Sequence, residues 1–235
     1  MLIFYILLTF LTIGAFYWLF LSPYSQIFGP YPYHFKTDKK VIALTFDDGP
    51  NEPYTSQIVD YLDSKEAKAT FFVVGNNAKK SPLSLKKMIK SGHSVGAHSI
   101  NHKFINYLLQ PSYKNEIKKS KEIIYKITGK YPVLFRSPWL WHHPLLFSQL
   151  KKQDLIPTSG IFCSNLEVFK PSAKYIANVA IKKAYPGSII IFHDGYNSKG
   201  TNRQKSVDAV KIFVNNLTKK GYIFVTVEEL FELAE

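Results

Sequence analysis

The chain of 235 residues has a single cysteine, Cys163, and this scarcity excludes two classes of small protein. One thiol cannot build a disulfide framework, and it cannot supply the several sulfur ligands of a cysteine-rich zinc module. The stability of the fold must therefore come from an ordinary hydrophobic core. With 46% hydrophobic and 20% charged residues, the composition also excludes a disordered or collagen-like chain and fits one large domain.

Charged residues are missing from the first 35 positions, and Lys36 is the first to appear. Residues 2–21 form an apolar run, and about 20 apolar residues suffice to cross a bilayer as a helix. The basic region and small-residue cleavage site of a signal peptide do not precede Ser22. We expect an uncleaved transmembrane anchor at 2–21 with Tyr17, Trp18 and Tyr24 at the interface, a linker at 22–39 and one folded domain at 40–235.

Acidic residues are also scarce, because 17 Asp and Glu face 30 Lys and Arg and leave a formal net charge of +13. The lysines are scattered and match no recognition motif, so we expect no nucleic-acid partner. We expect them to lie on solvated helix faces, where anionic lipid or cell-wall polymer can interact with them. Lys36, Lys39 and Lys40 follow the apolar run, and the positive-inside rule alone would keep them in the cytoplasm.

Strand-like and helix-like patterns alternate from residue 41 onwards. Strands are predicted at 41–46, 69–74, 95–97, 132–135, within 155–163, at 188–192 and at 222–227. Helices are predicted at 54–62, after Pro82, and at 112–128, 144–152, 172–183 and 205–219. This order predicts an α/β domain with a parallel sheet of about seven strands. Without a glycine fingerprint after the first strand, a distorted or incomplete (β/α) barrel is favoured over a nucleotide-binding sheet.

Polar residues stand at the carboxyl ends of predicted strands, where parallel α/β folds collect their reactive groups. Asp47 and Asp48 follow the first strand, and two carboxylates this close need a cation nearby. His98 and His102 are four residues apart, one helical turn, which is a metal-ligand spacing. Two histidines and one carboxylate leave coordination positions open, as catalytic metal sites do.

Two further strand ends carry single polar residues. Arg136 follows the strand at 132–135, and His193 ends the apolar strand at 188–192. Taken separately, they read as a surface ion-pair residue and a core histidine. Polar residues at several strand ends of one parallel fold together favour an active site.

These segments resemble the motifs of the polysaccharide deacetylases, carbohydrate esterase family four, also called the NodB homology domain. Residues 45–50 read TFDDGP, residues 98–102 HSINH, residues 136–139 RSPW and residues 191–194 IFHD, in the family's order. The resemblance runs from about Lys40 to Leu230 and implies a distorted (β/α) barrel, in agreement with the alternation above. It implies a hydrolase that removes N-acetyl groups from N-acetylglucosamine-containing polysaccharide and releases acetate.

Carried over position by position, the resemblance implies that Asp48, His98 and His102 bind a divalent metal ion, with zinc favoured. Such an ion would polarise the acetyl carbonyl and lower the pKa of a water molecule.

The resemblance also implies the groups that move protons. Asp47 would be the catalytic base, held oriented and ionised by Arg136, and His193 would protonate the departing amine from the opposite side. Trp139 would line the sugar site, with its backbone N–H near the oxyanion.

One family motif is missing. An Asp-Trp pair usually precedes the sixth helix, and its aspartate orients the acid histidine, whereas residues 166–169 read LEVF here. The aspartate position falls on Val168 or, with a shift of one residue, on Glu167, and such a shift reverses the face of a strand. If nothing replaces the aspartate, burial beside a cation would keep the pKa of His193 low.

Other functions fit parts of the sequence. Residues 92–96 read GHSVG, the pattern of a serine esterase with Ser94 as nucleophile, but in a helix-then-strand context instead of strand-then-helix. The metal-ligand set alone also fits an iron oxygenase. Neither alternative uses Arg136. The non-enzymatic alternative is a membrane-anchored carbohydrate-binding protein that has lost turnover along with the missing aspartate, and the presence of Asp47 argues against it.

We expect the catalytic domain outside the cytoplasm, because polymeric N-acetylated glycans are mostly found there, and this outweighs the lysines after the apolar run. Peptidoglycan, a chitin-like oligomer and a glycolipid stay open as substrates, and so does the oligomeric state.

Overall fold

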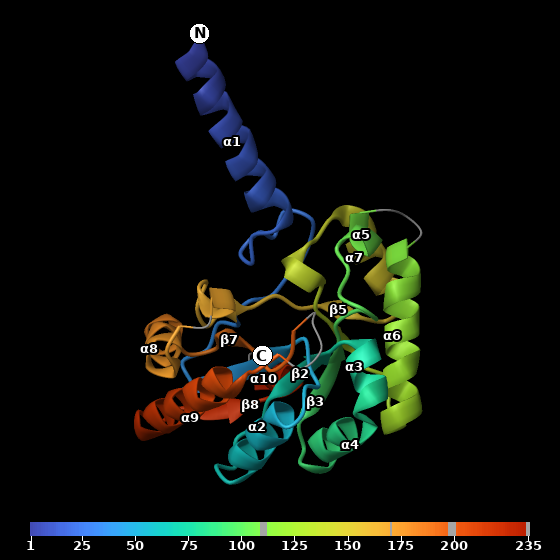
Figure 1. Ribbon diagram of the computed structural model, residues 1–235, viewed down its shortest axis with the longest axis vertical. Helices are drawn as coiled ribbons and strands as arrows, with labels where there is room; N and C mark the ends of the chain where they lie inside the picture. Colours follow the sequence, from blue (N-terminus) through green and yellow to red (C-terminus); the bar gives the residue numbers. More distant parts are fainter. Residues whose placement is uncertain (109–111, 170, 197–200, 234–235) are drawn as a thin grey trace.

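The structure is a computed structural model and describes residues 1–108, 112–169, 171–196 and 201–233. One apolar helix, α1 (Leu2–Phe20), projects from an α/β domain (Figure 1). None of its residues is buried, and it has the length and composition of a membrane span, a test that an N-terminal signal sequence also passes.

The domain is built on an eight-stranded sheet in which every pair is parallel. Its strands are β1 (Val41–Asp47), β2 (Thr70–Val73), β3 (Ser94–Ala97), β4 (Leu134–Phe135), β5 (Ile156–Pro157), β6 (Ile161–Phe162), β7 (Ile189–His193) and β8 (Ile223–Val225). The strands follow the order β5-β4-β3-β2-β1-β7-β6, and β8 pairs with β1 beside this path. The predicted parallel α/β architecture is confirmed.

The two edges of the sheet come close together at a seam. Strands β5 and β6 are the two ends of the strand order, yet only residues 158–160 separate them in the chain. The sheet therefore curls into an incomplete barrel, as predicted. The sequence pattern at 155–163 had suggested one strand, and the segment instead forms two strands of two residues, one on each edge, which explains the count of eight.

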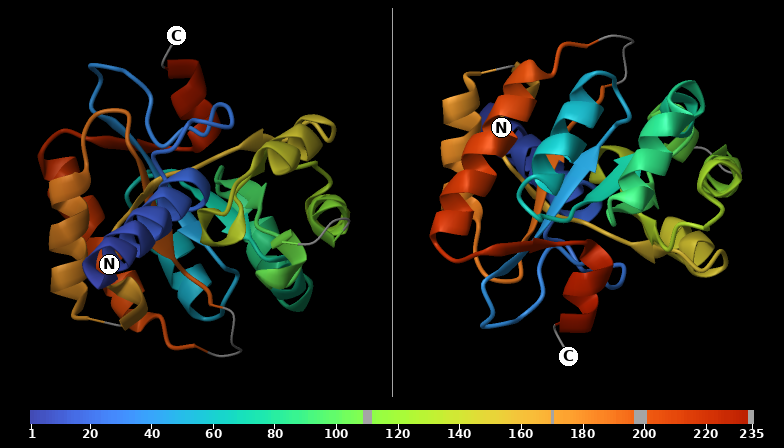
Figure 2. Two further views of the ribbon diagram at one scale, coloured as in Figure 1. Left: turned by 90° about the horizontal axis from the view of Figure 1, so that it is seen from above. Right: turned by 90° about the horizontal axis from the view of Figure 1, so that it is seen from below.

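Helices surround this barrel in the α/β order (Figures 1 and 2). They are α2 (Tyr54–Asp63), α3 (Gly75–Lys80), α4 (Pro82–Lys90), α5 (Ile105–Leu108), α6 (Ser112–Thr128), α7 (Pro144–Lys151), α8 (Ala173–Lys183), α9 (Gln204–Lys219) and α10 (Val227–Leu233), with 3-10 turns η1 (Pro138–Leu140) and η2 (Glu167–Phe169). The longer helices match the predicted ranges. Helices α3, α5 and α10 were not predicted, because they are too short to show a helical periodicity of apolar residues in the sequence.

The central strand β1 is buried along its whole length. Its Phe46 ring stacks on Phe71 of β2 at 4.9 Å, and Phe192 of β7 packs edge-on against Phe213 of α9 at 5.4 Å. Each such side chain contributes about 1.5–3 kcal/mol through burial. The strand ends that carry the polar residues are thus held on a rigid frame.

The segment between α1 and β1, predicted as a linker, packs along the seam of the barrel. Tyr31 is 1% exposed and contacts Leu140 and Ile191. At the seam itself, the Ser159 hydroxyl donates to the carbonyl of Pro23 (2.7 Å), and the Ser159 amide donates to the carbonyl of Pro32 (2.9 Å). The N-terminal segment is therefore part of the packed domain.

Candidate active site

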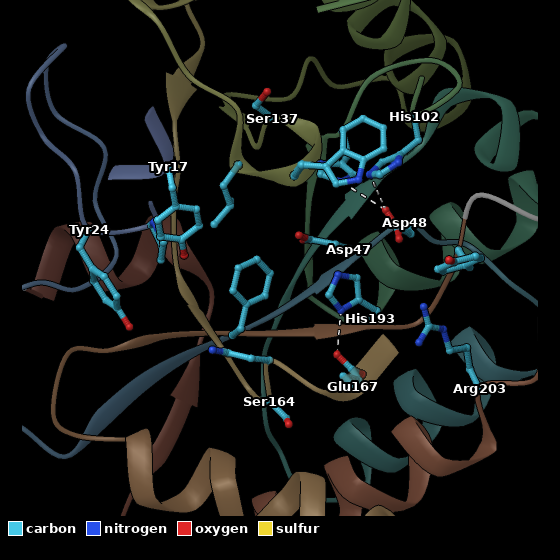
Figure 3. Close-up of a pocket in the computed structure, with 17 residues that line it drawn as sticks. Tyr17, Tyr24, Asp47, Asp48, His102, Ser137, Ser164, Glu167, His193 and Arg203 are labelled. Atoms are coloured by element: carbon cyan, nitrogen blue, oxygen red, sulfur yellow. Dashed lines mark hydrogen bonds and ion pairs between the residues drawn. The ribbon is translucent and has the colours of Figure 1, made fainter. Parts of the chain in front are cut away.

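A cavity of about 490 Å³ opens at the carboxyl ends of the strands, on the side from which α1 projects. This volume falls in the range of small-ligand sites. The predicted site residues that line it come from four strand ends, namely Asp47, Asp48, His98, His102, Trp139 and His193 (Figure 3). Arg136 lies beneath them and is fully buried.

Asp48, His98 and His102 form a buried cluster whose ligand atoms all lie within 4.8 Å of one another. Nε2 of His98 is 3.3 Å from Oδ1 of Asp48, and Nε2 of His102 is 3.1 Å from the same oxygen. Burial opposes the charged form of Asp48, but its interactions with the two imidazoles outweigh it and hold the pKa of this carboxyl well below its usual range. Burial also lowers the pKa of His102, to about 4.

The proton positions in this cluster fit a bound cation. Nδ1 of His98 lies 2.7 Å from the carbonyl oxygen of Arg136, which can only accept, so Nδ1 carries the proton and the lone pair of Nε2 faces Asp48. Oδ1 of Asp48 and Nδ1 of His102 are buried without a hydrogen-bond partner. A lone pair that faces a carboxylate oxygen inside the protein calls for a positive charge between them.

The two histidines meet for a different reason than the one predicted. Residues 98–102 are not helical, because Ser99 and His102 have positive φ angles of 71° and 56°. The Ser99 hydroxyl accepts a hydrogen bond from the amide of His102 (2.9 Å) and closes the loop. Asp48 also has a positive φ, 73°. Such strained non-glycine residues cluster at functional sites, where the surroundings hold them.

Asp47 forms a buried ion pair with Arg136. Nη1 of Arg136 donates to Oδ1 of Asp47 at 2.7 Å and to the hydroxyl of Thr45 at 2.8 Å. The other side of the guanidinium donates to the carbonyls of Thr158 (3.3 Å) and Ser159 (2.7 Å) at the seam. Arg136 therefore fixes the orientation of Asp47 and ties the barrel edges to it.

His193 is paired with Glu167, which resolves the question raised by the missing motif. Nδ1 of His193 lies 2.8 Å from Oε2 of Glu167 (Figure 3). The hydroxyl of Ser206 donates to Oε1 of Glu167 at 3.0 Å. Burial alone would lower the pKa of His193, but the carboxylate of Glu167 outweighs this and raises it to about 9. The low pKa expected of an unpartnered histidine therefore does not apply.

The pairing depends on a local conformation that the sequence pattern did not indicate. Glu167 belongs to the 3-10 turn η2, so the two-face alternation of a strand does not govern its side chain. The segment leaves Glu167 4% exposed beside His193, whereas Phe169, two residues later, is 78% exposed.

Aromatic side chains form the walls of the cavity. Trp139, with a positive φ of 56°, packs on His102 with ring centroids 4.2 Å apart and is 40% exposed. The ring of Phe162 lies parallel to that of His193 at 6.3 Å. Tyr17 and Tyr24, predicted as membrane-interface aromatics, also line the cavity.

Arg203 also lines the cavity, and the sequence analysis did not predict it. It is 5% exposed, and its Nε donates to the carbonyl of Gly195 at 2.7 Å. It precedes α9 in a segment without an apolar period, so no sequence pattern marks it.

Ser94 lies away from this cavity. It begins β3 at the end opposite His98, and its hydroxyl donates to Oε1 of Glu228 at 2.5 Å. The chain reaches Ser94 from helix α4 and continues as a strand, so the turn is not a nucleophile elbow.

Comparison with known proteins agrees with this geometry. The family model for polysaccharide deacetylase matches residues 34–155. The chain is 34% identical over 194 residues to a peptidoglycan-N-acetylglucosamine deacetylase of Bacillus cereus, covering 82% of this chain and 89% of the relative. It is 36% identical over 197 residues to the peptidoglycan-N-acetylmuramic acid deacetylase PdaC of Bacillus subtilis, covering 83% of this chain and 40% of the relative.

Among solved structures, the Bc1960 peptidoglycan N-acetylglucosamine deacetylase is similar with a TM-score of 0.79 and 31% identity. The match covers 86% of this chain and 92% of that one.

Proposed function

This chain belongs to the polysaccharide deacetylase family, and we propose that it is a metal-dependent hydrolase that removes N-acetyl groups from an N-acetylglucosamine-containing glycan and releases acetate. One observation carries the proposal. A buried Asp-His-His cluster lies beside a carboxylate, Asp47, that is held by Arg136, and across the cavity stands His193 with its own carboxylate partner.

Asp48, His98 and His102 would hold the metal, and zinc suits two imidazoles and one carboxylate with open positions. When bound, the ion supplies Lewis acidity that polarises the acetyl carbonyl and makes water a stronger acid.

The remaining residues divide the proton transfers between them. We assign Asp47 as the base that takes a proton from the attacking water, because Arg136 fixes one of its oxygens and orients the carboxylate at the cavity. His193 uses Nδ1 for Glu167, which leaves Nε2 to give a proton to the amine nitrogen as its bond to the acetyl carbon breaks. The products are acetate and a free amino sugar. Glu167 is a positioning residue, since it keeps His193 charged and oriented.

Trp139 is our candidate for the sugar contact. Its ring is partly exposed in the cavity beside His102, and a flat apolar face suits the apolar face of a pyranose.

The non-enzymatic alternative has lost its main support. It rested on a missing partner for the acid histidine, and Glu167 occupies that role in the hydrogen-bond network of His193.

We further propose that α1 anchors the protein in a membrane, with the catalytic domain outside the cytoplasm. The support is the uncharged helix α1, in which no residue is buried, together with relatives named for activity on peptidoglycan.

The test is acetate release by the purified full chain in detergent from peptidoglycan, chitin oligomers and other N-acetylglucosamine glycans. The full chain is needed because residues 22–35 pack on the barrel. We expect release from at least one glycan, its loss after a chelator and its recovery with Zn²⁺. No acetate from any glycan in the presence of added zinc would refute the proposal.

A further inference from the structure

The end of α1 is fixed to the catalytic domain and does not hang from a flexible tether. The ring of Phe20 stacks on Trp141 at 5.3 Å, and Phe16, one turn earlier, lies 5.8 Å from the same ring. The amide of His142 donates to the carbonyl of Phe20 at 3.0 Å. Together with the seam contacts of the following segment, these interactions set the direction of α1 relative to the barrel.

This junction also forms one wall of the cavity. Tyr17, in the last turn of α1, and Pro23 and Tyr24 after it line the same cavity as Asp47 and His193 (Figure 3). These wall residues precede residue 34, where the match to the family model begins. The wall is thus contributed by a part of the chain that the family model does not include.

The length of α1 indicates where this wall of the cavity lies relative to the bilayer. Nineteen residues of helix span about 28 Å at 1.5 Å per residue, close to the roughly 30 Å of a hydrocarbon core. When α1 crosses the bilayer, Tyr17 stands at its boundary, the level that tyrosine rings prefer. Because Phe16 already touches the domain, the barrel lies against the membrane, and the cavity opens at the depth of the lipid headgroups.

We propose that the substrate is the saccharide headgroup of a membrane-embedded glycolipid, an N-acetylated amino sugar attached to a lipid, and that Tyr17 and Tyr24 bind it at the bilayer surface. This inference rests on the deacetylase activity and the membrane span proposed above. A sugar tethered to lipid reaches a cavity at headgroup depth directly and is concentrated by sharing the enzyme's membrane.

The experiment uses the full chain in phosphatidylethanolamine–phosphatidylglycerol vesicles with zinc. Acetate release is measured from an N-acetylglucosamine trisaccharide coupled to a lipid, from the same trisaccharide free in solution, and from purified peptidoglycan. We expect kcat/KM at least tenfold higher for the lipid-coupled sugar than for the free one. Tyr17→Ala combined with Tyr24→Ala is expected to bring that ratio close to one. Both side chains are about half exposed, at 54% and 44%, so the fold should tolerate the change.

Tyr5→Ala is the matched control, because Tyr5 is equally exposed at 55% but lies in the first half of α1, away from the cavity. It is expected to leave the ratio unchanged. A ratio near one for the unaltered protein, a ratio that survives the double substitution, or faster release from peptidoglycan would each overturn the inference. Failure on all substrates would instead refute the deacetylase activity itself.

Discussion

Oε2 of Glu167 lies 2.8 Å from Nδ1 of His193, so the histidine that we propose as the acid has a carboxylate partner from the segment that lacks the family's Asp-Trp pair. The pair explains how His193 stays protonated although it is packed among buried groups. Its Coulomb attraction outweighs burial and raises the pKa of His193 to about 9.

Glu167→Gln is expected to move the alkaline limb of the kcat profile to lower pH. The protonated form of His193 donates the proton, so activity is lost as the pH rises through its pKa. Without the carboxylate, burial is opposed only by the weaker attraction of Asp48 and Asp47, so the pKa of His193 falls, by about 1–3 for the loss of an opposite charge at this distance. The measurement is kcat from pH 5 to 10. Glu66→Gln removes the same charge from an exposed position and should leave the limb in place; an unmoved limb in Glu167→Gln would assign the proton donor elsewhere.

His193→Ala is expected to reduce kcat roughly 100-fold or more, the usual contribution of a positioned acid. Metal content should be unchanged, since His193 does not belong to the Asp-His-His cluster. Steady-state kinetics together with elemental analysis of the purified variant separates the two effects. A loss of only a few-fold would mean that another group protonates the amine.

Substitutions of the adjacent carboxylates Asp47 and Asp48 are both expected to abolish activity but to differ in their effect on bound metal. Asp48→Ala and His98→Ala should lose both bound metal and activity, because a three-ligand site loses much of its affinity with one ligand. Asp47→Asn should keep the metal and lose activity, because it removes the base only. Zinc content and acetate release of each variant decide the matter, and an empty site in Asp47→Asn would exchange the two roles.

Arg136→Met is expected to lower the free energy of unfolding by about 3–5 kcal/mol, the usual effect of removing one partner of a buried ion pair. It leaves Asp47 without its cation, and the carbonyls of Thr158 and Ser159 lose their donor. Denaturant titration in detergent measures the change. Lys119→Met, on the exposed face of α6, should stay within about 0.5 kcal/mol of the parent protein. Equal stabilities of the two variants would show that the pair contributes little.

External protease is expected to digest the domain in intact cells, because we place it outside the cytoplasm. The readout is loss of the full-length band, with a cytoplasmic protein as the control for cell integrity. Protection of the domain while its digestion proceeds in lysed cells would put the active site on the cytoplasmic face.

The polar strand ends could be predicted because a parallel barrel gathers them irrespective of local detail. His98 and His102 illustrate the limit of that reasoning. Their spacing suggested a helical turn, whereas a loop with positive φ at Ser99 and His102 brings them together. The residues that converge can be identified from the sequence. The conformation of a strained loop cannot, because it depends on the surrounding structure and leaves no periodic pattern in the sequence.

Glu167 and the N-terminal segment show a second limit. Strand alternation is the wrong rule for a 3-10 turn, so the sequence could not decide between Glu167 and Val168. The contacts of Ser159 with Pro23 and Pro32 join segments more than 100 residues apart, and such pairings leave no mark in local composition.

The position of Arg136 at the seam has an evolutionary consequence. At many active sites, neutralising a reactive group stabilises the fold, so activity is easily lost by drift. Here a chain that lost Asp47 would retain a buried guanidinium without its carboxylate, directly where the barrel edges meet. Inactive descendants would therefore be expected to change both positions together, and a lineage that keeps Arg136 has a structural reason to keep Asp47.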